Sequence, residues 1–494
     1  MKKIYLLLCL SIVTLHAQDG TMDNTFNYNG SNGISIGPLT DYGDICHLQA
    51  SGKLIAGGEV KDAYRVGYTK MGLARFDNDG LIDRTFGTNG VVLLYPNSFD
   101  HFIAQIENDP AGNLFVLGTY GSRYCVAKLT IDGIVDTTFG TNGFVIEQSF
   151  EVSKMALLDD GKFLLYGTGW IGNTRSAGIK RYLANGTLDT TFGVNGLLKI
   201  NIGSADNFSG RIFVQPDGKI VATGSYEYVE NAVTLKKLFL TRLMPDTGAT
   251  DTSYGVNGFN TSTEMIGFRY AKMKSDGTIT VLGYRLSPTA EANSVRATFD
   301  ANGNIIADRT LYFYANGRCI TMQPDGKILY AGSYIDAVEA NGANCFFVRL
   351  DANGNYDPTF GNQGMLRKAF SAGNEDILDI EVGADGKIYF SGYSMLADFD
   401  FLVGRINSGL VVLETENFEA SDTFTVSPNP VGNVLEISSK SQIRESRIFD
   451  IQGRLVQTSN GLKTIDVSGL PSGMYILSAV SNDNIVSRTK FVKK

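Results

Sequence analysis

The sequence predicts an all-β protein, a seven-bladed β-propeller followed by a small immunoglobulin-like β-sandwich. A hairpin-like motif recurs seven times, with 49 to 60 residues between successive motif glycines, which is typical of a repeat array. Glycine is abundant, at 56 of 494 residues, and aromatic residues reach 11%, as expected of a strand-rich chain. Residues 424–494 lack the motif, which predicts a separate domain.

The first 17 residues have the pattern of an export signal. Lys2 and Lys3 precede an apolar run from Ile4 to Leu15, and the small Ala17 is followed by polar residues. This run is too short to span a bilayer comfortably, and no later run approaches the length that a membrane helix needs. Acylation at Cys9 is the alternative, which the apolar residues beyond it disfavour. We therefore expect no transmembrane segment and a chain exported through the periplasm.

Cysteine usage leaves two alternatives open. After the signal, the cysteines are Cys46, Cys125, Cys319 and Cys345, an even number that an oxidising compartment could pair. Cys319 and Cys345 fall in one repeat and are the better candidates for a disulfide. Buried, unpaired thiols are an equal alternative.

The first motif is seen best in QPDGKI, which occurs at Gln215 and again at Gln323. Proline presets φ at the first turn position, aspartate suits the second, and glycine adopts the left-handed conformation at little cost. The motif therefore predicts a tight turn between two strands. A phosphate-binding loop is disfavoured because no helical pattern follows. The seven motif glycines are Gly52, Gly112, Gly161, Gly218, Gly277, Gly326 and Gly386.

Two further motifs share this period. A run that ends in Arg or Lys before a turn predicts a strand leading into a second hairpin; such runs begin at Leu73, Val126, Ile179, Phe347 and Val403. The third motif, of the type LDTTFGVNG, begins at Met22, Ile82, Val135, Leu188, Thr250 and Tyr356, and it has decayed near Leu311. We expect its aromatic residues to pack between neighbouring repeats; they are Phe86, Phe139, Phe192, Tyr254 and Phe360.

The order of the motifs predicts how the array closes. A unit of three or four short strands without a helical period is typical of a propeller blade, so seven turns predict seven blades over residues 18–410. The array begins with a third motif and stops after a second-motif strand near Gly409. Residues 34–39 are therefore expected to complete the last blade, which leaves no open edge. An open solenoid is the alternative, but it does not explain why the two ends of the array hold complementary parts of one repeat.

These motifs resemble those of the delta-sixty repeat family, bacterial propeller-like proteins in which LDxTFGxNG and QPDGKI signatures recur in register. The resemblance covers roughly residues 22–410. It implies a propeller-like fold and no settled activity, so the ligand stays open.

The C-terminal part has its own composition. An acidic stretch, residues 411–423, is predicted to be a linker. Residues 18–423 hold 32 Lys and Arg against 46 Asp and Glu, a net charge of −14, whereas residues 424–494 hold 9 against 5, a net charge of +4. Short strand-like runs separated by turns, such as SRIFDI and GMYILSAV, predict a small β-sandwich of immunoglobulin-like size in residues 424–494.

This domain resembles the type A C-terminal sorting domain of type IX secretion substrates, through VSPNPVGNVLEI, IFDIQGRLV, IDVSGLPSGMYIL and the terminal KFVKK. The resemblance implies recognition by the type IX secretion machinery and passage through the outer membrane of a Gram-negative bacterium. It also implies removal of the domain and a product that is either released or attached to the surface. An ordinary appended β-sandwich is the alternative. The motif residues are Pro428, Asn429, Pro430, Gly453, Arg454, Gly473, Tyr475, Lys493 and Lys494.

The strand before each first-motif turn supplies the candidate ligand site. Side chains alternate along a strand, so the apolar positions six and four residues before the turn glycine form one face, which we expect to be core. The positions seven and five residues before it are mostly polar, differ between repeats and are predicted to line a central channel. A solvated channel wall without a ligand is the alternative. The candidate residues are His47, Gln105, Glu107, Lys154, Arg211, Tyr270, Lys272, Asp379 and Glu381.

The expected function is that of a secreted or surface-displayed binding or scaffold module, a monomer, with a glycan or protein as ligand. Only two histidines, His47 and His101, follow the signal. A histidine-rich metal site or a histidine-based catalytic triad is therefore disfavoured. Glu107 with Glu381, or with Asp379, could serve as an acid/base pair, so a polysaccharide-active enzyme is the alternative. The acidic propeller disfavours nucleic acid.

No cofactor is expected. The segment DNDGLID places Asp77, Asp79 and Asp83 close together, which makes calcium an alternative. The spacing of an EF-hand is absent, and turn chemistry explains the three carboxylates better.

Overall fold

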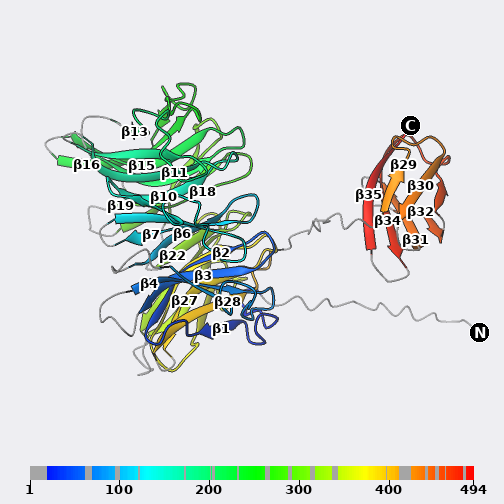
Figure 1. Ribbon diagram of the computed structural model, residues 1–494, viewed down its shortest axis with the longest axis horizontal. Coiled ribbons are helices and arrows are strands. Elements are labelled where there is room, and N and C mark those ends of the chain that lie inside the picture. Colours follow the sequence, from blue (N-terminus) through cyan, green and yellow to red (C-terminus); the bar gives the residue numbers. More distant parts are fainter. Residues whose placement is uncertain are drawn as a thin grey trace, which may run out of the picture. The chain divides into compact units, whose positions relative to one another are not determined.

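The computed structural model confirms the all-β prediction, because every regular element in the described residues is a strand. The chain divides into two units, residues 1–411 and 412–494, which are described separately below (Figure 1). The structure describes residues 19–61, 69–94, 101–120, 123–171, 174–200, 202, 206–230, 233–261, 267–286, 292–311, 318–335, 343–395, 398–410, 424–439, 443–450, 455–461, 463–481 and 486–494. The predicted signal and the predicted linker lie outside these residues.

The described residues of the first unit form seven four-stranded antiparallel sheets. The first comprises β2 (Asp41–Leu48), β3 (Leu54–Lys61), β4 (Thr69–Phe76) and β5 (Val91–Leu94). The second comprises β6 (Ile103–Asn108), β7 (Leu114–Tyr120), β8 (Arg123–Leu129) and β9 (Phe144–Glu147). The third comprises β10 (Glu151–Leu157), β11 (Phe163–Ile171), β12 (Thr174–Tyr182) and β13 (Leu197–Ile200). The fourth comprises β14 (Asn207–Val214), β15 (Ile220–Glu230), β16 (Val233–Leu243) and β17 (Phe259–Asn260).

Three further sheets complete this unit. The fifth comprises β18 (Gly267–Met273), β19 (Ile279–Leu286), β20 (Ala292–Phe299) and β21 (Ile305–Leu311), so an outer strand forms even where the third motif has decayed. The sixth comprises β22 (Cys319–Met322), β23 (Ile328–Ile335), β24 (Ala343–Leu350) and β25 (Met365–Lys368). The seventh comprises β26 (Glu375–Val382), β27 (Ile388–Met395), β28 (Phe399–Ile406) and β1 (Ser31–Ile34).

The first motif is the turn between the first two strands of a sheet, as predicted. The Gly218 amide donates to the Gln215 carbonyl at 2.8 Å, and the Gln215 amide donates to the Lys219 carbonyl at 2.8 Å. Gly218 has φ of 80° and Gly326 has φ of 87°, the left-handed region that favours glycine. The sequence QPDGKI therefore occurs twice, since both copies form the same turn.

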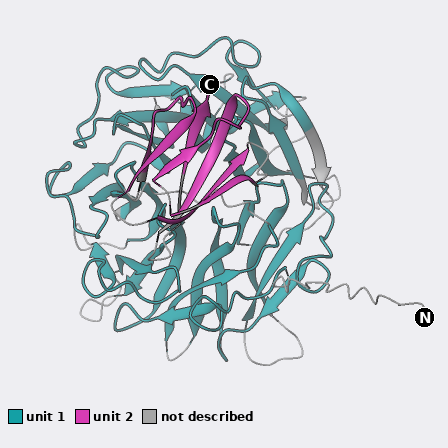
Figure 2. Ribbon diagram, turned by 90° about the vertical axis from the view of Figure 1, so that its right-hand side faces the viewer, with its two compact units in different colours: residues 1–411 teal, residues 412–494 magenta. Residues whose placement is uncertain are grey.

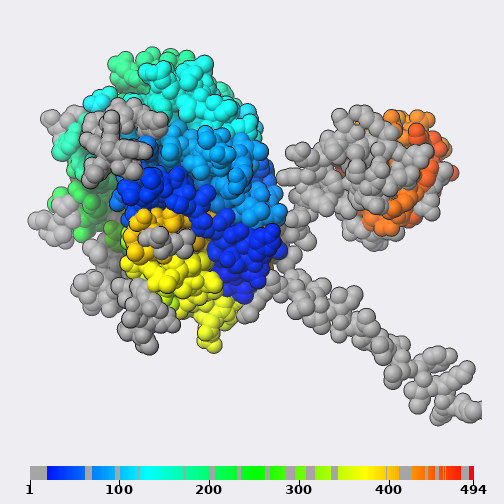
Figure 3. Space-filling view, turned by 60° about the horizontal axis from the view of Figure 1, so that its bottom comes forward, coloured from blue at the N-terminus to red at the C-terminus, as the bar shows by residue number. Residues whose placement is uncertain are grey.

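The seventh sheet takes its outer strand from the start of the chain. β1 pairs with β28, with Ser31 opposite Gly404 and Ile34 opposite Phe401, and Figure 3 shows the blue N-terminal residues against the yellow and orange residues of the last repeat. The closing strand was predicted at residues 34–39, which is wrong, because the strand begins three residues earlier and ends five residues earlier. The amides of Ile36 and Gly37 both donate to Asp41 Oδ2, so this segment turns towards the first sheet and cannot extend β1.

The sheets follow one another in a ring (Figure 2). Each contacts the next, and β2 of the first sheet contacts β26, β27 and β28 of the seventh. The third-motif aromatic residues pack between sheets, as predicted, and are at most 1% exposed. Phe139, for example, lies 5.7 Å in ring-centroid distance from both Phe115 of the second sheet and Phe163 of the third.

The four cysteines in the described residues are all free and buried. The alternative of a Cys319–Cys345 disulfide is wrong. Cys319 lies opposite Ala331 and Cys345 opposite Ser333, so strand β23 separates the two cysteines. Strands two apart in a sheet are about 9 to 10 Å from each other, which exceeds the reach of a disulfide.

The second unit consists of two sheets around one apolar core. One sheet has the order β29 (Phe424–Ser427), β30 (Val434–Ser439) and β33 (Thr464–Asp466). The other has the order β32 (Leu455–Asn460), β31 (Ile443–Asp450), β34 (Gly473–Ser481) and β35 (Val486–Lys493). Tyr475 packs on Phe491 in this core and donates its hydroxyl to the Pro471 carbonyl at 2.9 Å.

The described motif residues of this unit tie its beginning to its end. The Val492 amide donates to Asn429 Oδ1 at 2.9 Å, and the Lys494 amide donates to the Val431 carbonyl at 2.9 Å. The peptide bonds before Pro428 and Pro430 are cis. Gly453 and Arg454 lie outside the described residues. No helix in the part of the chain that the structure describes is long and apolar enough to cross a membrane.

Candidate functional site

A β-bulge recurs in the innermost strands of the ring. Pairing with the second strand shifts register between Ile103 and Gln105 in β6, and between Val152 and Lys154 in β10. Similar shifts occur in β2, β14, β18 and β26. A bulge bends a strand and redirects the side chains beside it. Sequence alternation alone could not locate it.

Burial along these strands follows the prediction at one of the two positions that were expected to be core. The six residues Cys46, Ile106, Met155, Ile212, Ala271 and Ile380, all six positions before the turn glycine, are at most 6% exposed. Most residues of the opposite face are half-buried, including Lys154, Arg211 and Glu381. The position six residues before the turn glycine is therefore buried as predicted, apart from the half-buried Ile320. The position four residues before it was also expected to be core, but only Met322 is buried there; half-buried are Leu48, Asn108, Leu157, Val214, Met273 and Val382. Four of these, Asn108, Leu157, Val214 and Met273, line the cavity described below.

Many of the candidate residues fasten one inner strand to the next. Gln105 Nε2 donates to the Met155 carbonyl at 2.9 Å, and its Oε1 accepts from the Met155 amide at 2.9 Å. His47 hydrogen-bonds Asn108, and the Leu48 amide donates to Glu381 Oε2 at 2.9 Å. These side chains therefore hold the ring together in addition to lining it.

The same role extends around the channel. The Cys46 amide donates to Asp379 Oδ2 at 3.1 Å, and Lys272 Nζ donates to the Met322 carbonyl at 3.1 Å. The Tyr270 hydroxyl hydrogen-bonds the Thr321 hydroxyl at 3.1 Å. Burial raises the pKa of Tyr270, so this hydroxyl keeps its proton at neutral pH.

Charge is distributed unevenly round the channel. Glu107, Asp379 and Glu381 come from the second and seventh sheets, whereas Lys154, Arg211 and Lys272 come from the third, fourth and fifth. Burial raises the pKa of Glu381 to about 8, helped by the negative charges of Asp379 and Glu107. Burial, and then the charge of Arg211, lower the pKa of Lys154 to about 8. At pH 7 the Glu381 carboxyl is therefore largely protonated, so these residues carry less negative charge than a count of their carboxyls indicates.

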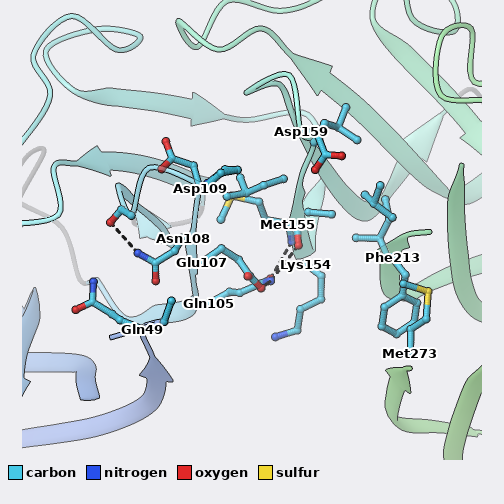
Figure 4. Close-up of a pocket in the computed structure, with 18 of the residues that line it drawn as sticks. Gln49, Gln105, Glu107, Asn108, Asp109, Lys154, Met155, Asp159, Phe213 and Met273 are labelled. Carbon is cyan, nitrogen blue, oxygen red and sulfur yellow. Dashed lines mark hydrogen bonds between the residues drawn. The ribbon is translucent and has the colours of Figure 1, made fainter. Parts of the chain in front are cut away.

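A cavity of about 680 Å³ opens beside these residues. Figure 4 shows Phe213 and Met273 together on one side, Gln105 and Asn108 on the other, and the Lys154 side chain reaching between them. The rim is formed by first-motif turns, including Ser51, Pro110 and Asp159. Of the nine predicted residues, those that line this cavity are Gln105, Glu107, Lys154 and Arg211.

The remaining five predicted residues do not line it. Glu381 borders a second cavity of about 350 Å³ between the seventh and first sheets. His47, Tyr270, Lys272 and Asp379 line neither of these cavities and make the bonds described above. Sequence reasoning missed Phe213, Met273 and Gln49, which line the first cavity. Phe213 was visible as the one large aromatic residue at its repeat position.

Sequence reasoning also missed an ion pair that links the second and third motifs. In five sheets the arginine one residue before the end of the third strand binds the third-motif aspartate of the same repeat, and a lysine does so in the second sheet at 3.5 Å. Four of these arginines belong to the second motif, and Arg242 occupies the equivalent position in β16. The arginine pairs are Arg75–Asp83, Arg181–Asp189, Arg242–Asp251, Arg349–Asp357 and Arg405–Asp23. The signal was the joint recurrence of both residues in one repeat.

Each of these arginines also reaches the next sheet. Arg75 Nη1 donates to the Ile131 carbonyl at 2.5 Å, and Arg405 Nη1 donates to the Asn78 carbonyl at 2.8 Å. Arg181, Arg242 and Arg349 donate in the same way to Pro245, Ala301 and Ser408. These arginines therefore link neighbouring sheets as well as the two motifs of their own repeat.

Two of the three aspartates considered as calcium ligands, Asp77 and Asp83, bind other groups of the protein. Asp83 Oδ2 binds Lys53 and Arg75, each at 2.8 Å, and Asp77 Oδ1 accepts from the amides of Asp79 and Leu81. Within the described ranges, no group of three or more His, Cys, Asp or Glu side chains is spaced to hold a metal ion. These contacts account for Asp77 and Asp83 as turn and ring-joining residues.

Comparison with protein families gives two matches. Residues 425–494 match the secretion system C-terminal sorting domain. Residues 49–86, 158–192 and 323–360 match a β-propeller described as a domain of unknown function (DUF5122). The propeller prediction is therefore confirmed for the repeats. No curated protein matches the chain.

Solved structures are similar at low identity. The β-propeller domain of the Trilobed protease from Pyrococcus furiosus is 8% identical, with a TM-score of 0.40, covering 74% of this chain and 95% of that chain. Drosophila Plexin A, in complex with Semaphorin 1b, is 9% identical, with a TM-score of 0.39, covering 78% of this chain and 87% of that chain. An endo-arabinase from Bacteroides thetaiotaomicron is 13% identical, with a TM-score of 0.27, covering 55% of this chain and 94% of that chain.

Proposed function

We propose that this β-propeller, which a C-terminal sorting domain directs to the cell surface or the extracellular space, is a binding module whose ligand enters the cavity described above. The observation that best supports this proposal is that one position of the repeat holds a different residue in every sheet. The residues seven before the turn glycine are Ile45, Gln105, Lys154, Arg211, Tyr270, Cys319 and Asp379, and no two are alike. The adjacent core position stays apolar or small in every repeat. Differences between repeats at one position allow a repeat protein to build an asymmetric site.

The cavity supports this role in size and lining. Its volume of about 680 Å³ falls in the range of small-ligand sites. Apolar residues, Phe213 and Met273, share its wall with charged residues, Lys154 and Arg211. Such sites combine apolar area with a few polar groups that orient the ligand.

Binding is tested with the purified full chain against panels of glycans and of extracellular proteins. We expect saturable binding to one of them. The substitution Ala156→Phe places a ring in the cavity that Ala156 lines, and it should weaken binding at least tenfold. Val194→Phe, at a residue 77% exposed and outside the cavity, is the matched control. A chain that binds nothing in either panel contradicts the proposal.

A second candidate function rests on the state of Glu381. With a pKa of about 8 this carboxyl is protonated at pH 7, as a general acid must be, and Glu107 lies close enough to influence it. Glycoside hydrolysis uses such a pair of carboxyls. On the binding-module proposal, we expect no new reducing ends when the full chain is incubated with polysaccharides.

Glu107→Gln and Glu381→Gln decide between the two functions. Release of reducing ends that either substitution abolishes, with folding intact by circular dichroism, would replace the binding module with an enzyme. Release that both variants retain would point to a contaminating enzyme, and the binding-module proposal would stand.

Export by the sorting domain gives a separate prediction. We expect a chain without residues 424–494 to accumulate in the periplasm, because the type IX machinery has lost its recognition element. Cell fractionation and immunoblotting measure this. Phe213→Ala, which changes the other unit, should be exported normally. Normal export of the truncated chain would refute the sorting role.

A further inference from the structure

We infer that the cavity binds a sugar that carries a carboxylate, a uronate residue of an acidic polysaccharide. This inference rests on the proposed binding function and specifies its ligand. Three kinds of group line the cavity: a pair of cations, hydrogen-bond acceptors and apolar side chains. A uronate presents the matching groups on a single residue, which are a carboxylate, several hydroxyl donors and an apolar ring face.

The cation pair is formed by Lys154 and Arg211. They occupy the same repeat position on β10 and β14, the inner strands of adjacent sheets. Lys154 Nζ makes one long bond, at 3.3 Å, to the Ala104 carbonyl. The Arg211 guanidinium lies 5.8 Å from the centroid of the Tyr270 ring. No hydrogen bond from this guanidinium to another described residue is present. Several donors of the pair are therefore available to a ligand.

Neighbouring carboxylates compensate the pair only in part. Asp379 attracts both cations, but burial raises its pKa, and its oxygens already accept the amides of Cys46 and Ile380. Glu107 Oε1 accepts from Gln105 Nε2 at 2.7 Å. The pKa of Lys154 stays lowered despite these carboxylates. An incoming carboxylate would relieve the repulsion between Lys154 and Arg211, and the planar guanidinium suits carboxylate geometry.

The acceptors favour a hydroxyl-bearing ligand. Gln49 is 7% exposed and lines both cavities, and its buried Oε1 has no hydrogen-bond partner among the described residues. A buried acceptor without a donor is unfavourable, because it has lost its hydrogen bonds to water. Gln49 Oε1 would gain a partner if its amide turned towards a sugar hydroxyl in the cavity. Glu107 is a second acceptor on the same wall.

The apolar wall completes the match. Phe213 and Met273 lie together across the cavity from Gln105 and Asn108 (Figure 4). The face of an aromatic ring carries partial negative charge and attracts the C–H groups of a sugar ring. The terminal carboxylate of a peptide could also meet Lys154 and Arg211, but it brings no set of hydroxyl donors. The observations therefore favour the acidic sugar.

The test measures binding of the full chain by calorimetry to hexuronate oligosaccharides, to their methyl esters and to neutral oligosaccharides. We expect at least one hexuronate to bind, and its methyl ester to bind at least tenfold more weakly. Arg211→Gln and Lys154→Met should each weaken hexuronate binding at least tenfold. Arg367→Gln is the matched control, since this exposed arginine also stacks on a tyrosine, 5.0 Å from the Tyr334 ring centroid, and lies outside the cavity.

A pH series adds a readout that needs no variant. Lys154 is charged below its pKa of about 8 and neutral above it, and Glu381 gains its negative charge over the same range. Both changes oppose an anion, so hexuronate affinity should fall from pH 7 to pH 9. An affinity that stays constant or rises over this range contradicts the inference.

The outcomes separate this inference from the binding function. If esters and neutral oligosaccharides bind as well as hexuronates and Arg211→Gln has no effect, the binding function stands and the acidic-sugar inference fails. If only peptides with a free terminal carboxylate bind, and do so through Arg211, the sugar class is wrong. If no glycan, protein or peptide binds, both proposals fail.

Discussion

Replacing Arg349 with alanine should lower the free energy of unfolding by about 3 to 5 kcal/mol, the usual loss when one partner of a buried ion pair is removed. Arg349 is fully buried and binds Asp357 and Asp19, each at 2.9 Å. It also donates to the Ser408 carbonyl of the next sheet and lies over Phe360, 4.8 Å from the ring centroid. The substitution leaves carboxylates with fewer partners in the interior and removes a link between sheets. Urea unfolding of the full chain measures the loss.

Arg84→Ala is the control for this experiment. Arg84 belongs to the third motif but is exposed, and its loss should change stability by at most about 0.5 kcal/mol. Equal effects of the two substitutions would mean that the motif ion pairs do not join the sheets energetically.

Phe26→Ala should cost about 3 to 5 kcal/mol, although this residue precedes the first strand of the chain. Phe26 is fully buried, and the Arg405 guanidinium of the last repeat lies 5.2 Å from its ring centroid. A Cβ added at Gly80, in the first repeat, would come within 2.6 Å of the Phe26 ring, so the fit is tight. Thermal and urea unfolding measure the effect.

Tyr28→Ala serves as the control two residues further on. Tyr28 is 85% exposed, and its removal should leave stability almost unchanged. If Phe26→Ala behaves like Tyr28→Ala, the N-terminal segment does not seal the last blade as the structure indicates.

Local chemistry explains what could be predicted of the fold. The turn that begins at Gln215 depends on the next three residues, which are proline, aspartate and glycine, so it can be predicted directly from the sequence. The use of the chain start in the last sheet followed from the order of the motifs. The exact bounds of the closing strand could not be predicted from the order of the motifs, because they depend on Asp41 accepting the amides of Ile36 and Gly37. That contact exists only once the first sheet is in place.

The candidate site was predictable as a face but not as a cavity. Alternation placed Lys154 and Arg211 on one side of their strands, and the structure brings them to the same cavity. Alternation could not show that Gln105 binds the backbone of Met155, or that Gln49 has a buried acceptor without a partner among the described residues. These properties depend on the spacing of neighbouring sheets and on the bulges that bend the inner strands.

The pairing of β1 with β28 also bears on how the molecule is made. Ser31 and Gly404 face each other across a sheet, although almost the whole array separates them along the chain. During synthesis, residues 31–34 leave the ribosome long before their partner strand exists. Completing the circle therefore has to wait for the final repeat, and contacts this distant in sequence are slow to form. Assembly should end with a late sealing step that joins the oldest and the newest parts of the array.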